Sequence, residues 1–111
     1  MPKVFATWVM TLRRGVTKEE FERFVREELP AKPLPGTKLR ILKGERGEGL
    51  GKYLSLNEFE SMELWNRYFP MSGGQVTHSS EAQELMQSET FRKFLSLIDE
   101  PHMSDWVVVL E

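Results

Sequence analysis

Histidine is the side chain best suited to acid-base catalysis near neutral pH, and this chain carries two, His78 and His102. His78 is the stronger candidate for a catalytic role, because it follows a flexible Ser-Gly-Gly segment and stands just before an expected helix. The alternative is an ordinary solvated loop histidine. The two histidines lack His-x-His or His-x-x-x-His spacing and the chain has no cysteine, so we predict no metal site.

A second group of candidate residues belongs to an expected β-hairpin. Tyr53, Ser55 and Asn57 alternate along one side of a strand, and Lys38 and Arg40 belong to the strand before it. Together they could line a small pocket for an anionic or carbonyl-bearing ligand, with Arg40 as the charge-pairing group. The alternative is that these side chains satisfy one another or meet a partner sheet.

Several aromatic side chains could wall a ligand cavity, above all Trp65, because the short helix expected around it is unusually aromatic. The alternative is ordinary core packing, which is the usual fate of aromatic residues at strand or helix spacing. The candidates are Trp8, Trp65, Tyr68, Phe69 and Trp106. The glycine-rich segment 44–51 lacks the lysine and hydroxyl residue of a phosphate-binding loop and joins two expected strands, so we interpret it as a hairpin loop.

The charge balance argues against a nucleic-acid partner. The chain has 15 basic and 17 acidic residues, a net charge of -2, and binding to phosphates needs a clustered positive field. No apolar run approaches the roughly 18 residues needed to span a bilayer, and no stretch has the pattern of a secretion signal. We therefore predict a cytoplasmic protein without a membrane partner, and the sequence gives no reason to predict a cofactor.

The elements that would position these residues follow the order strand, helix, strand, strand, helix, strand. Thr17 with Glu20 has the spacing of a capping box, Ser61 is a good N-cap, and a second box begins at Ser80, before a helix that Ser88 kinks or divides. The segments 71–77 and 99–104 are expected loops. The expected strands cover residues 4–12, 37–42, 52–59 and 105–111.

This βαββαβ order predicts a single α+β domain over residues 1–111, in which helices cover one face of a four-stranded antiparallel sheet. The first strand is apolar on both faces. Phe5 and Val9 lie on one side, and the residues on the other side are Val4, Ala6, Trp8, Met10 and Leu12. Because helices cover only one face, we predict that a second copy of the chain covers the other.

The segments VFATWVMTL followed by RRGVTKEEF, then GKYLSLNEFESMELW, and finally ELMQSETFRKFL resemble the dimeric α/β-barrel superfamily, whose members include antibiotic-biosynthesis monooxygenase-like and stress-responsive proteins. The resemblance implies a ferredoxin-like fold, a homodimer whose two sheets pack face to face as a barrel, and a ligand held between sheet and helices. The stress-responsive branch has a histidine in the first strand and the haem-degrading relatives have an asparagine there. This chain has neither, but Thr7 and Thr11 instead.

The leading functional hypothesis is a small dimeric barrel that binds a small organic ligand, similar to cofactor-independent monooxygenases. Its expected ligand residues are Trp65, Arg40, Tyr53, Asn57 and Trp8, with His78 as the catalytic candidate. The alternative is a non-catalytic ligand-sensing or oligomerisation module. An RNA-recognition domain shares the element order, but the third strand has Tyr53, Ser55 and Asn57 where that domain needs two aromatic residues, and the chain is acidic.

Overall fold

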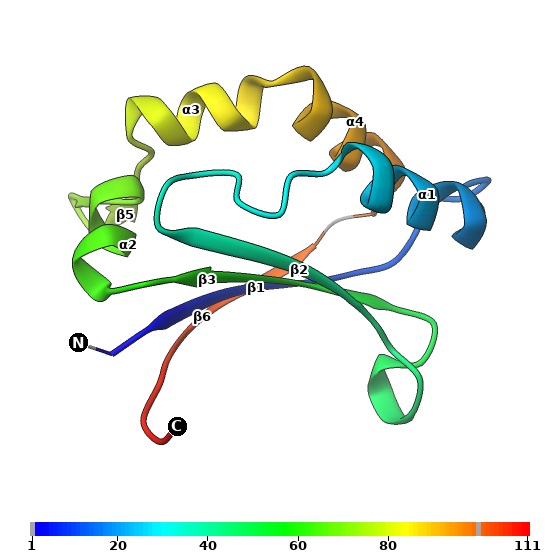
Figure 1. Cartoon of the computed structure of the whole chain (residues 1–111), viewed down its shortest axis with the longest axis horizontal. Coiled ribbons are helices and arrows are strands. Elements are labelled where there is room, and N and C mark those ends of the chain that lie inside the picture. The colour runs from blue at the N-terminus through cyan, green and yellow to red at the C-terminus, as the bar shows by residue number, and fades with distance from the viewer. Residues whose placement is uncertain (1, 100) are drawn as a thin grey trace.

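The computed structural model describes residues 2–99 and 101–111, and its helices cover one face of a four-stranded sheet (Figure 1). The strand order is β2-β3-β1-β6 and each neighbouring pair is antiparallel, which confirms the predicted α+β class. The predicted domain also includes residues 1 and 100, which lie outside the described residues. In chain order the elements are β1 (Val4–Met10), α1 (Lys18–Glu28), β2 (Thr37–Lys43), the 3₁₀ turn η1 (Gly47–Gly49), β3 (Tyr53–Phe59), α2 (Met62–Tyr68), β4 (Met71–Ser72), β5 (Gln75–Val76), α3 (Ser80–Gln87), α4 (Glu89–Leu97) and β6 (His102–Val107).

The two faces of the sheet differ in how they are covered. Val4 of β1 pairs with Phe59 of β3, and both side chains are fully buried under the helices. Thr7 pairs with Leu56 in the same two strands, and alternation along the strands places these side chains on the opposite, open face. Even-numbered residues of β1 and odd-numbered residues of β3 therefore face the helices.

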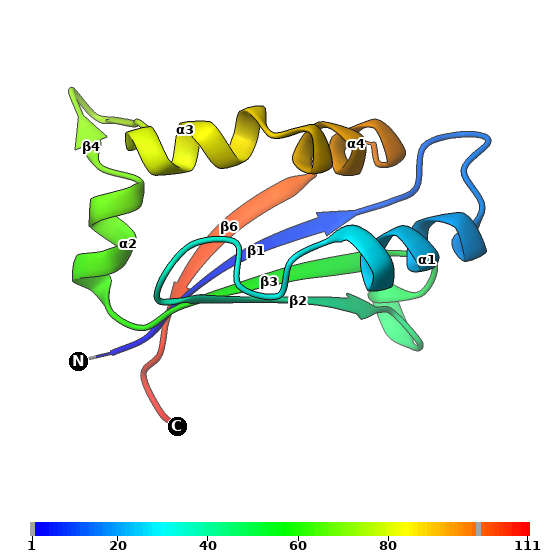
Figure 2. The same cartoon turned by 45° about the horizontal axis from the view of Figure 1, so that its top comes forward.

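The core consists of two clusters on the helix-covered side. One lies beneath α1 and α4, which stand above the same end of the sheet (Figure 2). The other lies beneath α2. The buried members of the first are Met10, Phe21, Phe24, Tyr53, Phe94, Leu97 and Ile98, and those of the second are Val4, Leu34, Phe59 and Tyr68. None of the helices that the structure describes is long and apolar enough to cross a membrane.

Serine and threonine side chains fix where the helices begin. Thr17 accepts a hydrogen bond from the backbone N–H of Glu20 at 3.1 Å, and Ser61 caps α2 in the same way, which confirms both predicted caps. The third cap is Ser79 and not Ser80, since the Ser79 hydroxyl accepts from the N–H three residues later. Ser88 divides the last helical segment into α3 and α4.

The strand ends differ from the predicted ones because strands extend only as far as their partners. β1 ends at Met10, and Leu12 makes only an isolated bridge to Ile98. β6 covers His102–Val107 and not 105–111, since its partner β1 spans Val4 to Met10. After Val108, whose N–H binds the Lys3 carbonyl, no strand pairs with the tail. The predicted loop 71–77 contains the two-residue strands β4 and β5.

Candidate functional site

The expected ligand residues are divided between the two faces of the sheet. Tyr53 and Asn57 of β3 and Trp8 of β1 point toward the helices, whereas Arg40 of β2 pairs with Leu56 and points to the open face. Within one chain Arg40 therefore does not line a pocket with Tyr53 and Asn57, and that part of the sequence-based prediction is wrong. The prediction placed Arg40 on the same face as Tyr53 and Asn57, whereas the register of the two strands places it on the face of Leu56. A shift of one residue in register moves every side chain of a strand to the other face.

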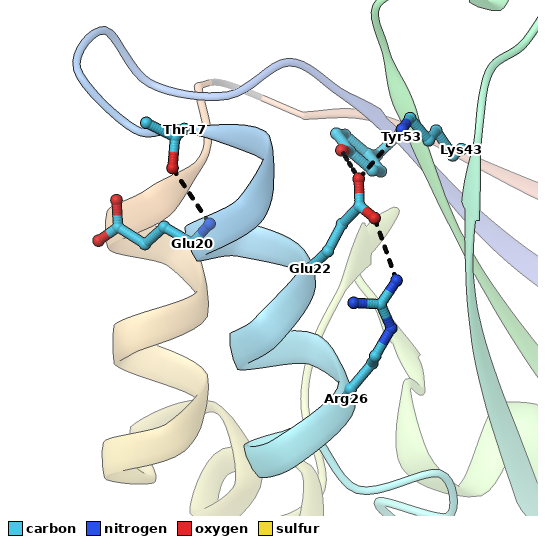
Figure 3. Close-up of polar contacts among 6 residues, drawn as sticks. All are labelled: Thr17, Glu20, Glu22, Arg26, Lys43 and Tyr53. Atoms are coloured by element: carbon cyan, nitrogen blue, oxygen red, sulfur yellow. Dashed lines mark hydrogen bonds and ion pairs between the residues drawn. The ribbon is translucent and has the colours of Figure 1, made fainter.

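Tyr53 is held by a charged network between α1 and the strands β2 and β3 (Figure 3). Its hydroxyl donates to Glu22 Oε2 at 2.6 Å, and the same carboxylate is 3.3 Å from Lys43 Nζ and 3.2 Å from Arg26 Nη2. The hydrogen bond from Tyr53, together with Lys43, holds the pKa of Glu22 below its usual value. Burial and the Glu22 carboxylate raise the pKa of Tyr53, so the phenol stays protonated. Tyr53 therefore connects α1 to the sheet, and its hydroxyl hydrogen is not available to a ligand because it bonds to Glu22.

Trp8 packs as a core residue. Its ring lies 5.8 Å from Phe91, edge to face, and 6.4 Å from Phe94, stacked, both residues belonging to α4. These contacts attach α4 to the middle of β1 and account for Trp8 without a ligand.

Asn57, Ala6 and Asp105 form one row across three adjacent strands on the helix-covered side. The Oδ1 atom of Asn57 is buried and has no hydrogen-bond partner. Two strand spacings away, about 10 Å between Cα atoms, Asp105 stands at the other end of the row, and the Trp65 indole of α2 favours the ionised form of its carboxylate. Ala6 between them contributes only a methyl group. We call this row the seam. Asn57 belongs to it, and Trp65 of α2 lies on the same side of the sheet, so two of the expected ligand residues share this side.

The seam lies where the two core clusters meet. Ala6 and Trp65 pack against the cluster under α2, while Trp8, one row along the sheet, packs against the cluster under α1 and α4. Partial burial raises the pKa of Asp105, against the opposing effect of the Trp65 indole. The sequence analysis missed Asp105. The available signal was an acidic residue at the start of the largely apolar segment 105–111, at a position that alternation places on the same side as Met103 and Val107.

His78 lies at the outer end of this region. Its exposed ring meets Phe69 edge to face at 5.4 Å, and its backbone carbonyl accepts a hydrogen bond from the Gln83 side chain. Phe69 in turn packs against Phe59 of the sheet, 5.9 Å away. His78 therefore borders the α2 side of the core and is accessible to solvent.

Two surface hollows lie at the other end of the molecule. One, of about 420 Å³, runs along the charged side of α1 past Glu22 and Arg26, and the other, of about 170 Å³, lies beside the hairpin loop at Leu50. Both are bordered by Lys18 and Lys43, and charged side chains of both signs line them. Among the described residues, no group of three acidic or histidine side chains lies close enough to hold a metal ion.

The open face of the sheet carries three rows of side chains. The first is Lys38, Glu58, Phe5 and Trp106, the second Arg40, Leu56, Thr7 and Ser104, and the third Leu42, Leu54, Val9 and His102. Glu58 lies 3.8 Å from both Lys3 and Arg40, and the Trp106 indole donates to Thr7 at 2.9 Å. Trp106 is nonetheless 59% exposed. No described element covers this face (Figure 1).

Comparisons with known proteins identify the fold. No protein-family model matches the sequence, and no curated protein matches it. A search of solved structures found an uncharacterized NIPSNAP-like domain protein from Burkholderia xenovorans, with a TM-score of 0.59 and 14% identity over 98% of this chain and 85% of that chain. It also found a dimeric protein of unknown function with a ferredoxin-like fold from Bacteroides fragilis, with a TM-score of 0.52 and 17% identity over 94% of each chain.

A third similar structure is a candidate antibiotic biosynthesis monooxygenase from Bacillus cereus, with a TM-score of 0.51 and 16% identity over 100% of this chain and 97% of that chain. At this level of identity the three likenesses establish the fold and not the activity. They confirm the predicted ferredoxin-like fold, which is the fold that the resemblance to the dimeric α/β-barrel superfamily implied.

Proposed function

We propose that the chain forms a homodimer through the open faces of its sheets and binds a small organic molecule at the seam, between sheet and helices. The observation that carries the ligand site is the buried, unpartnered Oδ1 of Asn57, which lies in the same row as the carboxylate of Asp105. Buried polar atoms are almost always hydrogen-bonded in native proteins, so an unpartnered one calls for a water molecule or a ligand.

The composition of the open face supports the dimer. Its apolar side chains, Phe5, Val9, Leu42, Leu54, Leu56 and Trp106, belong to all four strands of the sheet. An apolar patch of this extent on a soluble domain usually marks an interaction surface. A twofold dimer would bring the same patch of both copies together, and the Bacteroides fragilis neighbour is described as dimeric.

Cofactor-independent oxygenation of the bound molecule is a second candidate function, because the Bacillus cereus neighbour is a candidate monooxygenase. His78 is the proposed acid-base residue of such a reaction, since it borders the α2 side of the core and reaches solvent. A non-catalytic sensing or oligomerisation module would bind the same molecule without consuming oxygen. Measurement of oxygen consumption with the identified ligand separates the two. A cytoplasmic location stays a prediction from the sequence.

Mass spectrometry of small molecules extracted from the purified protein tests the ligand site. We expect the wild-type protein to retain a molecule that Trp65→Phe retains less well, because that change removes the indole donor and leaves an aromatic ring. Trp106→Phe is the matched control, since it makes the same change on the open face. Equal recovery from both variants would place the ligand elsewhere. Extracts of the wild type without any bound molecule would contradict the proposal.

A further inference from the structure

The unpartnered buried atom of the seam and its one charged group are both hydrogen-bond acceptors. Asn57 Oδ1 is buried and unpartnered, and Asp105 presents a carboxylate in the same row. A carboxylate has about four acceptor positions, so several stay available. The donor that Tyr53 could have supplied from the same strand is committed to Glu22 at 2.6 Å.

We infer that the ligand of the seam is an organic molecule that presents a hydrogen-bond donor, an amine or a hydroxyl, to Asn57 and Asp105. This inference rests on the proposed function and specifies the chemical class of its ligand. The sequence analysis favoured an anionic or carbonyl ligand because it grouped Arg40 with Asn57. Arg40 lies on the opposite face of the sheet, so that reason does not apply to the seam.

Asp105 determines the polarity of the site. Rotation of the Asn57 amide by 180° would present its NH₂ group in place of Oδ1, so this side chain can serve a donor or an acceptor. Asp105 has no such freedom when it is ionised, because a carboxylate only accepts. An anionic ligand would meet the like charge of Asp105, which raises the cost of binding.

The surroundings of Asp105 favour an organic molecule with an apolar body. Asp105 is flanked along β6 by Met103 and Val107, which point to the same side of the sheet and are 67% and 46% exposed. Trp65 contributes an aromatic ring from α2. A ligand that reaches the row from the β6 edge would cover these apolar side chains while its donor meets the carboxylate.

Three probes that share one ring but differ in polar group test the inference. Benzylamine is a cationic donor, benzyl alcohol a neutral donor and benzoate an anion without a donor. Each is titrated into the full-length ¹⁵N-labelled protein at neutral pH while the indole N–H signals of Trp8, Trp65 and Trp106 are followed, assigned from single Trp→Phe variants. We expect saturable shifts of the Trp65 signal with benzylamine and, more weakly, with benzyl alcohol, and none with benzoate.

Asp105→Asn removes the charge and keeps a side-chain oxygen that can accept a hydrogen bond. The variant should weaken the binding of benzylamine about tenfold, which is the difference between a charged and a neutral hydrogen bond. It should change the affinity for benzyl alcohol by less than about twofold. Asp99→Asn, the same change at an exposed position after α4, should leave benzylamine affinity unaltered. Benzoate binding as tightly as benzylamine would overturn the inferred polarity while leaving a ligand site in place.

Two other results would also overturn the inference. One is an Asp105→Asn variant that binds benzylamine as tightly as the wild type. The other is a Trp65 signal that none of the three probes shifts. In either case the mass spectrometry of extracted molecules still tests the proposed function independently, because it assumes no ligand chemistry.

Discussion

Replacement of Leu56 by glutamate should separate the proposed dimer into single chains. Leu56 lies in the middle row of the open face, between Arg40 of β2 and Thr7 of β1, and its side chain is half-buried in the single chain. Burial of a leucine side chain is worth about 1.5–3 kcal/mol, so the half that a partner would cover is worth about 1 kcal/mol. A twofold interface contains two copies, which gives about 2 kcal/mol, or a dissociation constant about 30-fold weaker.

The single chain should tolerate this change. A glutamate at position 56 would stand directly opposite Arg40, and opposite charges in a cross-strand pair are mildly stabilising. Leu50→Glu is the matched control, because Leu50 is 66% exposed in the hairpin loop and lies outside the sheet. Both variants alter the net charge equally, so a difference between them reports position and not charge.

Sedimentation equilibrium over a range of concentrations measures the effect. We expect the wild type and Leu50→Glu to associate with the same dissociation constant and Leu56→Glu to associate much more weakly. At concentrations where both are monomeric, Leu56→Glu should have the same thermal unfolding midpoint as the wild type. If Leu56→Glu dimerises as tightly as Leu50→Glu, the open face of the sheet is not the dimer interface.

Three further predictions concern stability. Ser88→Ala should lower the free energy of unfolding by about 1 kcal/mol in chemical denaturation, because the Ser88 hydroxyl caps α4 and also donates to the last turn of α3. Ser96→Ala, which removes a hydroxyl inside α4, should lower it by less. The lowered pKa of Glu22 adds stability that is present above its unfolded value near 4.5 and is lost as the pH falls through the folded value, so the unfolding midpoint of the wild type should drop on acidification more steeply than that of Tyr53→Phe. The raised pKa of Asp105 has the opposite sign, because its charged form is disfavoured in the folded state, so Asp105→Asn should raise the thermal midpoint at neutral pH and lose this advantage at low pH, where both states of the wild type are protonated.

The local elements of the fold could be predicted because their signals are local. Thr17 and Ser61 cap helices through hydrogen bonds to residues three positions later, and Ser88 interrupts a helix by the same means. The two-faced apolar pattern of β1 correctly indicated a central strand, which has neighbours on both sides in the structure. Such features depend on a few adjacent residues and need no knowledge of distant contacts.

The arrangement of the candidate site could not be predicted, because it depends on pairing between distant strands. Both faces of β3 carry bulky residues, Tyr53 and Phe59 on one and Leu54 and Leu56 on the other, so alternation alone does not say which face the helices cover. The polar side of β3 proved to be the covered one. The register of β2 against β3, in which Arg40 lies opposite Leu56, places Arg40 and Asn57 on different faces.

Asp105 was missed for a related reason. The extent of β6 is determined by β1, 97 residues earlier at the Thr7–Ser104 pair, and a run of β-branched residues at the end of the chain does not reveal where that pairing begins. Only the register of β6 places Asp105 beside Ala6 and in the same row as Asn57. Long-range register therefore defines the seam.

Native mass spectrometry of the wild-type protein at micromolar concentration reports both assembly and bound molecules in one spectrum. We expect a species at twice the 13.0 kDa chain mass that carries an additional small molecule, lost on mild activation. A spectrum that contains the 13.0 kDa chain alone, with neither a partner nor a bound molecule, would contradict this expectation.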